Sequence, residues 1–111
     1  MTSQCIEEKS LQPWFLYVLE TKHKHFYTGI TTQWRRRFKE HSSNTVKSAK
    51  ALRGKGPLTL RYCVQVPSHS IALQAEYWLK KQGKNKKTSI VEHSIPLPYP
   101  HTLVDFSNMA E

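Results

Sequence analysis

The chain has no long apolar run and only two cysteines. No stretch among its 111 residues approaches the roughly 18 consecutive apolar residues of a membrane-spanning helix, so no membrane partner is expected. The polar segment 1–9 holds two glutamates and lacks the features of a signal peptide. Cys5 and Cys63 lie far apart without CxxC spacing, which favours reduced thiols over a disulfide or a metal site. These absences together predict a cytoplasmic protein.

Acidic residues are also scarce. Lysine and arginine number 17 against 8 aspartates and glutamates, a formal net charge of +9. Between Lys22 and Arg61 there are eleven basic residues and one acid, Glu40, and a second block contains five lysines between 80 and 87 with no acid. Basic charge gathered in blocks is typical of nucleic-acid-binding proteins. On charge alone, an anionic protein or a membrane surface stays open as the partner.

Three segments have the pattern of β-strands in a chain that is long enough for one globular domain. Residues 14–19 are continuously apolar or aromatic, and residues 26–31 return after a polar turn to complete a hairpin. Residues 58–66 alternate between apolar and other side chains. The side chains predicted to share one face of that third strand are Leu58, Leu60, Tyr62, Val64 and Val66.

Two further segments are predicted helices. The first runs from about Gln33 to Ser42, with Thr31 or Thr32 as its N-cap. The second runs over 71–82 with Ser70 as its N-cap, and a short last helix follows Gly83. The order strand, strand, helix, strand, helix predicts the α+β class, with a small three-stranded, largely antiparallel sheet flanked by helices.

The domain organisation is predicted to be simple. Residues 1–13 are a polar lead-in, residues 14–89 the folded domain and residues 90–111 a C-terminal tail. The tail holds three prolines and has no clear periodicity, which favours an extended or partly ordered appendage. Segment 44–57 is basic with two glycines and is expected to be a loop or a loose helical turn.

Five side chains in this order could cut a phosphodiester bond with one metal ion. Tyr17 and Tyr27 lie on the two hairpin strands, and Arg37 and His41 lie four residues apart on one side of the helix that follows. Glu76 borders the apolar stripe of the second helix. Phenol, guanidinium, imidazole and carboxylate groups can supply a base, a phosphate clamp and a metal ligand. Taken singly, the tyrosines also fit core positions and Glu76 a surface position.

The order and spacing of several segments resemble the GIY-YIG nuclease domain family over about residues 14–87, and within it the stand-alone, single-domain bacterial members. Phe15-Leu16 replaces the Gly-Ile of the first tripeptide, and Gln33 stands where an acidic residue is common, but neither departure removes a reactive group. The segments that carry the resemblance are Phe15-Leu16-Tyr17, Tyr27-Thr28-Gly29-Ile30-Thr31-Thr32, the Arg37–His41 pair, residues 51–58 and residues 72–76.

The resemblance implies a role for each of the five side chains. Tyr17 would lie near the attacking water as general base, and Tyr27 would order the water and phosphate. Arg37 would hold the scissile phosphate, and His41 would accept or relay a proton from Tyr17. Glu76 would be the single carboxylate ligand of Mg²⁺ or Mn²⁺.

The sequence therefore predicts a metal-dependent endonuclease that hydrolyses DNA, with DNA favoured over RNA, in DNA repair or processing. Backbone contacts carry little sequence information, so weak sequence preference and a steep salt dependence of binding are expected. Two alternatives stay open: a catalytically inactive nucleic-acid-binding module with the same fold, and a protein–protein adaptor. The residues predicted to contact nucleic acid are Arg35, Arg36, Lys50, Arg53, Lys55, Lys80, Lys84 and Lys87.

Overall fold

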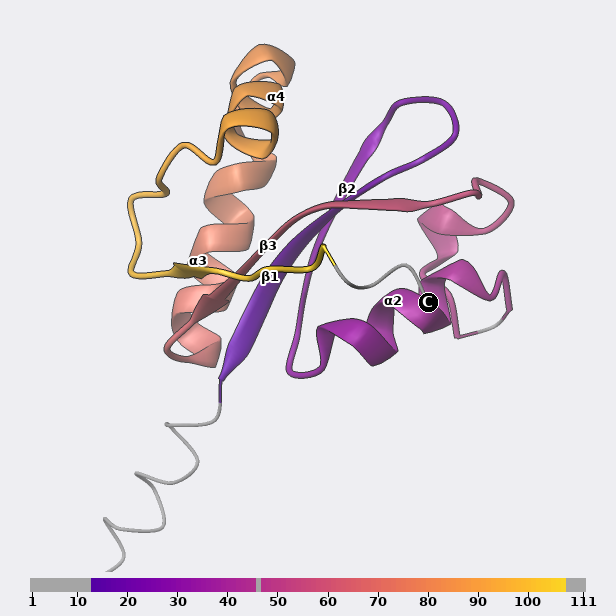
Figure 1. The fold of residues 1–111 in the computed structure, drawn as a ribbon, viewed down its shortest axis with the longest axis horizontal. Coiled ribbons are helices and arrows are strands. Elements are labelled where there is room, and N and C mark those ends of the chain that lie inside the picture. The colour runs from indigo at the N-terminus through magenta and orange to yellow at the C-terminus, as the bar shows by residue number, and fades with distance from the viewer. Residues whose placement is uncertain (1–12, 46, 108–111) are drawn as a thin grey trace, which may run out of the picture.

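The computed structural model describes residues 13–45 and 47–107. The predicted lead-in, including Cys5, therefore lies almost wholly outside the described residues, within which no helix is both long and apolar enough to cross a membrane. In chain order the elements are β1 (Trp14–Glu20), β2 (Phe26–Thr31), α2 (Trp34–Ser42), the short 3-10 helix η1 (Lys50–Leu52), β3 (Thr59–Val66), α3 (His69–Lys80), α4 (Lys84–His93) and β4 (Thr102–Leu103) (Figure 1).

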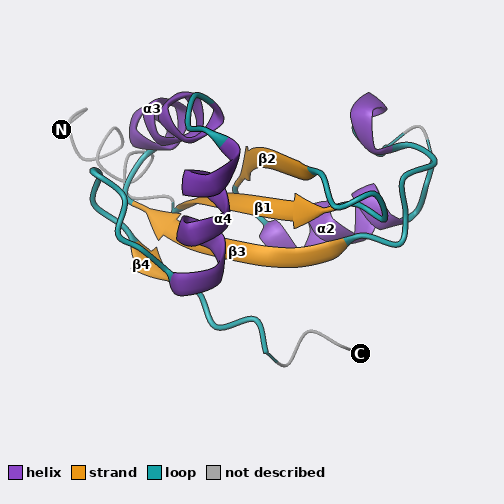
Figure 2. Ribbon diagram, turned by 90° about the horizontal axis from the view of Figure 1, so that it is seen from above, coloured by secondary structure: helices purple, strands orange, loops and turns teal. Residues whose placement is uncertain are grey.

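The strands form one antiparallel sheet in the order β2-β1-β3-β4, so that β1 and β3 are its internal strands. The predicted α+β class and the three predicted strands are confirmed. The sheet also has a fourth strand, β4, which lies beside β3 at the edge (Figure 2). A two-residue strand is too short to leave a periodic signal in the sequence.

Helices cover both faces of this sheet, with α3 and α4 together on one face and α2 with η1 on the other (Figure 1). We call these the α3 face and the α2 face. Successive residues of a strand point to opposite faces. In β1, Leu16 and Val18 are buried on the α3 face, and Tyr17 and Leu19 on the α2 face. Burial on both faces explains why the β1 sequence is continuously apolar rather than alternating.

The alternation predicted for β3 is broken by an irregularity at Arg61. The register with β1 skips this residue, so Leu60 and Tyr62 lie on opposite faces of the sheet. The prediction that Leu58 and Leu60 share a face with Tyr62 is therefore wrong. Because both faces are covered, side chains on either side of the irregularity are still buried.

The two predicted helix caps are also wrong. Gln33 occupies the N-cap position of α2 without a side-chain cap bond, and the Thr31 hydroxyl accepts from the Gln33 N–H at 3.1 Å just before the helix. In α3 the cap is Ser68, whose Oγ accepts from the Ile71 N–H at 3.2 Å. Ser68 has the extended backbone that an N-cap requires, whereas Ser70 already lies in the first turn.

The C-terminal segment, residues 90–107, packs against the rest of the fold. Helix α4 continues across the expected boundary between residues 89 and 90, and Ile90, Val91 and Leu97 are buried on the α3 face. After β4, the Val104 N–H donates to the Cys63 carbonyl at 3.0 Å, and Val104 and Phe106 pack against the α2 face. The tail therefore supplies side chains to both cores.

Candidate active site

The Tyr17 side chain crosses directly over Gly29. The two residues are opposite each other in the β1–β2 pairing. A Cβ atom at position 29 would lie 2.4 Å from the Tyr17 hydroxyl oxygen and 2.6 Å from Cζ, both inside van der Waals contact. Only glycine leaves room for the phenol ring here.

The Tyr17 hydroxyl is hydrogen-bonded to His41 of α2. The Tyr17 hydroxyl and His41 Nε2 are 2.9 Å apart, and the exposed fractions of the two residues are 4% and 1%. The Tyr27 ring completes the group: its centroid is 6.5 Å from that of Tyr17 and 5.5 Å from that of His41. Two strands and one helix therefore bring two phenols and one imidazole together.

A backbone amide fixes which nitrogen of His41 carries hydrogen. The Ala49 N–H donates to His41 Nδ1 at 3.1 Å. A neutral imidazole that accepts at Nδ1 carries its hydrogen on Nε2. His41 Nε2 therefore donates the hydrogen bond to Tyr17, whose oxygen accepts it.

Ser48 holds the loop that presents this amide. Its buried hydroxyl lies 2.8 Å from the Glu40 carbonyl oxygen and 3.0 Å from that of His41, at the end of α2. These contacts tie residues 48 and 49 to the last turn of the helix. The orientation of the His41 ring is thus set from outside the ring cluster.

Arg37 lies one helical turn before His41 and is fixed by two acceptors. Its Nη1 donates to Glu40 Oε1 at 2.8 Å and to the Lys47 carbonyl at 2.9 Å. The hydrogen bond from Arg37 lowers the pKa of the Glu40 carboxyl, which keeps it charged. The Arg37 side chain is 31% exposed, so a guanidinium of fixed orientation reaches solvent beside Tyr17.

Burial makes the neutral forms of Tyr17 and His41 the stable ones. It raises the pKa of Tyr17 well above its usual value, an effect that Tyr27 strengthens and the Arg37 guanidinium opposes. Burial also lowers the pKa of His41 to about 4, and the charge of Arg37 adds to the shift. At neutral pH the pair is therefore an uncharged phenol and an uncharged imidazole.

Glu76 approaches this group from α3. It borders the fully buried stripe of Ala72, Ala75 and Leu79, as the sequence predicts, and its side chain is 20% exposed. Its charge contributes to the raised pKa of Tyr17, which puts the two groups within electrostatic reach. Lys80 Nζ lies 3.2 Å from Glu76 Oε2, one turn along the helix, and neutralises the carboxylate.

A family model described as the GIY-YIG catalytic domain matches residues 13–89. The chain belongs to the GIY-YIG family. The family that the tyrosine tripeptides predict is thus confirmed, and it is a family of nucleases.

Curated relatives agree with this assignment. The chain is 48% identical to the UPF0213 protein YhbQ of Escherichia coli O139:H28 (strain E24377A / ETEC) over 84 residues, which cover 76% of this chain and 82% of the relative. It is also 48% identical to a UPF0213 protein of Citrobacter koseri over 81 residues, covering 73% and 79%. These bacterial relatives confirm the single-domain subgroup.

A solved structure is also similar. The solution NMR structure of the UPF0213 protein BH0048 from Bacillus halodurans shares 39% sequence identity with this chain, with a TM-score of 0.47. The match covers 71% of this chain and 82% of the other.

The donor chemistry of this GIY-YIG site suits a hard divalent cation. Residues 13–45 and 47–107 contain no group of three or more His, Cys, Asp or Glu side chains that could hold a metal ion. A single partly exposed carboxylate, Glu76, fits Mg²⁺ or Mn²⁺, which keep several waters and use substrate phosphate as a ligand.

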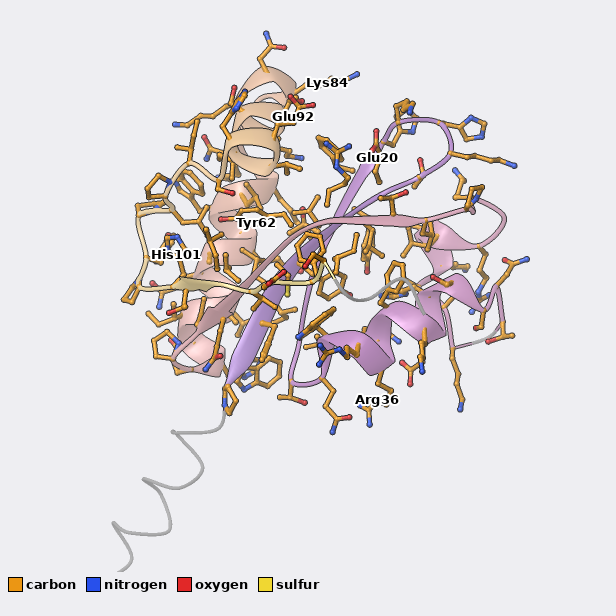
Figure 3. The ribbon with its side chains drawn as sticks, viewed as in Figure 1. Glu20, Arg36, Tyr62, Lys84, Glu92 and His101 are labelled. Carbon is orange, nitrogen blue, oxygen red and sulfur yellow. The ribbon has the colours of Figure 1, made fainter. Side chains whose placement is uncertain are left out.

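Five of the residues predicted to contact nucleic acid lie on α2, in η1 or in the loop that follows η1. The Arg35 guanidinium lies over the Trp34 ring at 4.6 Å, and Arg36 extends from the outer side of α2, 3.7 Å from Glu40 (Figure 3). Lys50, Arg53 and Lys55 are exposed in and after η1. The Lys55 carbonyl accepts from the Lys22 N–H at 3.0 Å, which brings this loop against the turn between β1 and β2.

The other predicted contacts lie on the opposite side of the sheet. Lys80 pairs with Glu76, Lys84 opens α4 and is exposed, and Lys87 is half-buried near Phe26 and Thr28 of β2. The eight basic residues therefore belong to two groups, one on each side of the sheet. Their contacts with nucleic acid stay predictions.

Sequence reasoning missed the groups that orient the site. Glu40, Ser48 and the amide of Ala49 hold Arg37 and His41, and none of them belongs to a tripeptide. Glu40 did leave a signal, because it is the one acid of the basic block between 22 and 61 and lies three residues after Arg37. A backbone amide leaves no sequence signal at all.

Proposed function

We propose that this protein is a metal-dependent endonuclease that hydrolyses phosphodiester bonds in DNA with little sequence preference, in DNA repair or processing. The observation that carries the proposal is the buried hydrogen-bond chain from the Ala49 amide through His41 to the Tyr17 hydroxyl, with Arg37 beside it. Membership of a nuclease family supports the reaction type. The general use of divalent ions in that family supports the metal.

Tyr17 would be the general base. His41 Nε2 lies 2.9 Å from its oxygen and the Arg37 guanidinium favours its charged form, and donors and cations near a charged form lower the free energy of that form. As a phenolate, Tyr17 would take a proton from water while the water oxygen bonds to phosphorus. The leaving oxygen would depart with the electrons of the broken P–O bond.

His41 would act as a hydrogen-bond donor to Tyr17, whereas the family resemblance implies that it accepts or relays a proton from Tyr17. Its Nε2 already carries hydrogen, and its Nδ1 accepts from the Ala49 amide. Accepting a proton would break the bond to that amide and create a charged ring in a residue that is 1% exposed. The proton lost by Tyr17 would therefore pass to solvent.

Arg37 and Tyr27 would hold the phosphate and the water. Two bonds, to Glu40 and to the Lys47 carbonyl, fix the guanidinium of Arg37 while part of it reaches solvent. A preorganised guanidinium stabilises the charge that develops on the phosphate oxygens in the transition state. The half-buried Tyr27 adds a second phenol at the edge of the ring cluster.

Glu76 would hold the divalent ion, with water and a phosphate oxygen as its other ligands. When bound, such an ion polarises the scissile phosphate and stabilises the leaving oxygen. Lys80, which pairs with Glu76 in the free protein, is 54% exposed and can swing into solvent.

The test is a cleavage panel of single-stranded, duplex, flap and branched DNA and of RNA, each with Mg²⁺, Mn²⁺ or EDTA. Glu76→Ala is expected to lose cleavage by about a hundredfold or more while still binding nucleic acid, because the carboxylate and the basic groups are separate. The matched control is Glu92→Ala, which removes an exposed carboxylate from α4 and only a 3.7 Å ion pair with Arg61. It should cut like the wild type.

Each outcome has a distinct meaning. Cleavage by Glu76→Ala at the parental rate would remove the metal assignment. Binding without cleavage under every condition would favour an inactive nucleic-acid-binding module. Affinity that stays equal between low and high salt would contradict recognition through phosphate contacts.

A further inference from the structure

A stripe of ring and apolar side chains runs along the exposed side of α3. His69, Leu73, Tyr77 and Lys81 follow one another at intervals of four residues, so they are neighbours on the helix surface. Leu73 is 47% exposed and Tyr77 is 64% exposed. The other exposed large hydrophobic side chains in the part of the chain that the structure describes are Ile95 and Leu103. We call these four residues, three of α3 and its C-cap Lys81, the α3 stripe.

The α3 stripe borders Glu76. On the helix surface Glu76 lies between the stripe and the buried positions, three residues from Leu73. The opposite flank of α3 is covered, because the Trp78 ring packs edge-on against Tyr99 at 6.5 Å and under Lys86 at 5.4 Å. The exposed flank is therefore the one beside Glu76.

The chemistry of the stripe combines ring faces with cations. Lys81 Nζ lies 4.6 Å from the centroid of the Tyr77 ring, and the His69 ring stacks on Trp14 at 4.2 Å. Surfaces that bind single-stranded nucleic acid combine aromatic faces, on which bases stack, with positive charge that attracts the backbone. A chain of net charge +9 favours a polyanion as the occupant of such a surface.

We propose that the α3 stripe binds unpaired nucleobases next to the phosphodiester bond that is cut, with Tyr77 and Leu73 as the stacking surface and Lys81 at the backbone. The proposal rests on the proposed function and specifies its substrate. Bases inside a duplex are covered by their neighbours and cannot stack on a protein ring. The preferred nucleic acid therefore has single-stranded nucleotides at the site.

The test compares two labelled single-stranded oligonucleotides of equal length and charge by fluorescence anisotropy in EDTA. One carries thymine throughout, and the other carries abasic sugars at its central positions. The wild type should bind the thymine oligonucleotide about fivefold more tightly or better. Tyr77→Ala should lose this difference, and Tyr77→Phe, which keeps the ring, should retain it. The matched control is Ile95→Ala, an exposed side chain beyond α4 that should change nothing.

Several results would overturn the proposal. Equal affinity of the wild type for both oligonucleotides would show that bases are not bound, and equal weakening of both by Tyr77→Ala would show the same. A wild-type dimer that Tyr77→Ala converts to a monomer, measured by light scattering, would assign the stripe to a second copy of the chain. Binding to duplex DNA but to neither oligonucleotide would overturn this proposal and leave the proposed function standing, whereas failure to bind nucleic acid of any form would remove the proposed function itself. Circular dichroism confirms that each variant is folded.

Discussion

Each face of the sheet buries one tyrosine from an internal strand, and the two hydroxyl groups have opposite surroundings. Tyr17 of β1, on the α2 face, accepts from His41, which is oriented in turn by the Ala49 amide. Tyr62 of β3, on the α3 face, is 2% exposed, and its hydroxyl has no hydrogen-bond partner among the described residues (Figure 3). Burial raises the pKa of Tyr62 to about 12, so both hydroxyls stay protonated.

This difference in hydrogen bonding reflects different roles of the two faces of the sheet. The α3 face is an apolar core of aliphatic side chains from all three long strands, α3 and α4, and its contribution is stability. The α2 face holds buried polar groups that are paired with one another, which costs stability unless every group is satisfied. Substitutions on the two faces should therefore have different signatures.

The largest expected change in stability comes from the α3 face. Ile90→Ala, at a fully buried position of α4, should lower the free energy of unfolding by about 2–5 kcal/mol because it opens a cavity. Urea denaturation measures this. The rate of cleavage per folded molecule should not change. The exposed Ile95, beyond the end of α4, provides the control, since Ile95→Ala should cost less than about 0.5 kcal/mol. A loss of activity in folded Ile90→Ala would contradict the division between the faces.

The α2 face should make stability depend on pH. His41 has a pKa of about 4 in the folded chain against 6.5 as its ordinary value, so the unfolded chain binds a proton first as the pH falls. The stabilisation is complete above pH 6.5 and should decrease by about 3 kcal/mol as the pH falls through 4. Unfolding measured at several pH values in the wild type and in His41→Phe checks this. Identical slopes in the two proteins would contradict it.

Tyr17→Phe should have a smaller effect on stability and a clear one on activity. The sequence favours little loss of stability, because only a hydroxyl is removed. In the structure that hydroxyl is the acceptor for a buried donor, His41 Nε2–H. Leaving this donor unpaired should cost about 1–3 kcal/mol, and cleavage should slow at least about tenfold. A folded variant that cuts at full rate would remove Tyr17 from the mechanism.

The smallest change comes from the same substitution on the other face. Tyr62→Phe removes a buried hydroxyl that has no partner among the described residues, so no donor or acceptor is left unpaired. The free energy of unfolding should stay the same or rise by up to about 1 kcal/mol. Denaturation of the two Phe variants side by side makes each the control for the other. An equal cost at both positions would mean that the two faces do not differ in this way.

The sequence predicted those parts of the fold that depend on local patterns. Continuous apolar residues in β1 and the four-residue spacing of Arg37 and His41 identified the hairpin and the helix face. The cap of α3 was misplaced because Ser68 and Ser70 are equivalent as residue types, and only the backbone angles distinguish them. The irregularity at Arg61 arises from the pairing of β3 with β1. The sequence of β3 alone therefore could not predict it.

The candidate site was predictable for a related reason. Its five reactive side chains were recognised from their order and spacing along the chain, and the structure brings Tyr27, Arg37 and His41 around Tyr17. Their supports could not be predicted, because the Ala49 amide reaches His41 only after the loop 43–49 has folded back on α2. That contact is the reason why we propose His41 as a hydrogen-bond donor to Tyr17.

Because Tyr17 lies so close to Gly29, the residue types at these two positions depend on each other, although they belong to separate tripeptides. A methyl group at position 29 would push the phenol away from His41, so the glycine can be replaced only if the tyrosine is lost or moved. A tyrosine on one strand and a glycine directly opposite it on the next therefore form a diagnostic pair. Such a pair would identify a site of this kind even where the neighbouring residues differ from the family's tripeptide, as Phe15 and Leu16 do in this chain.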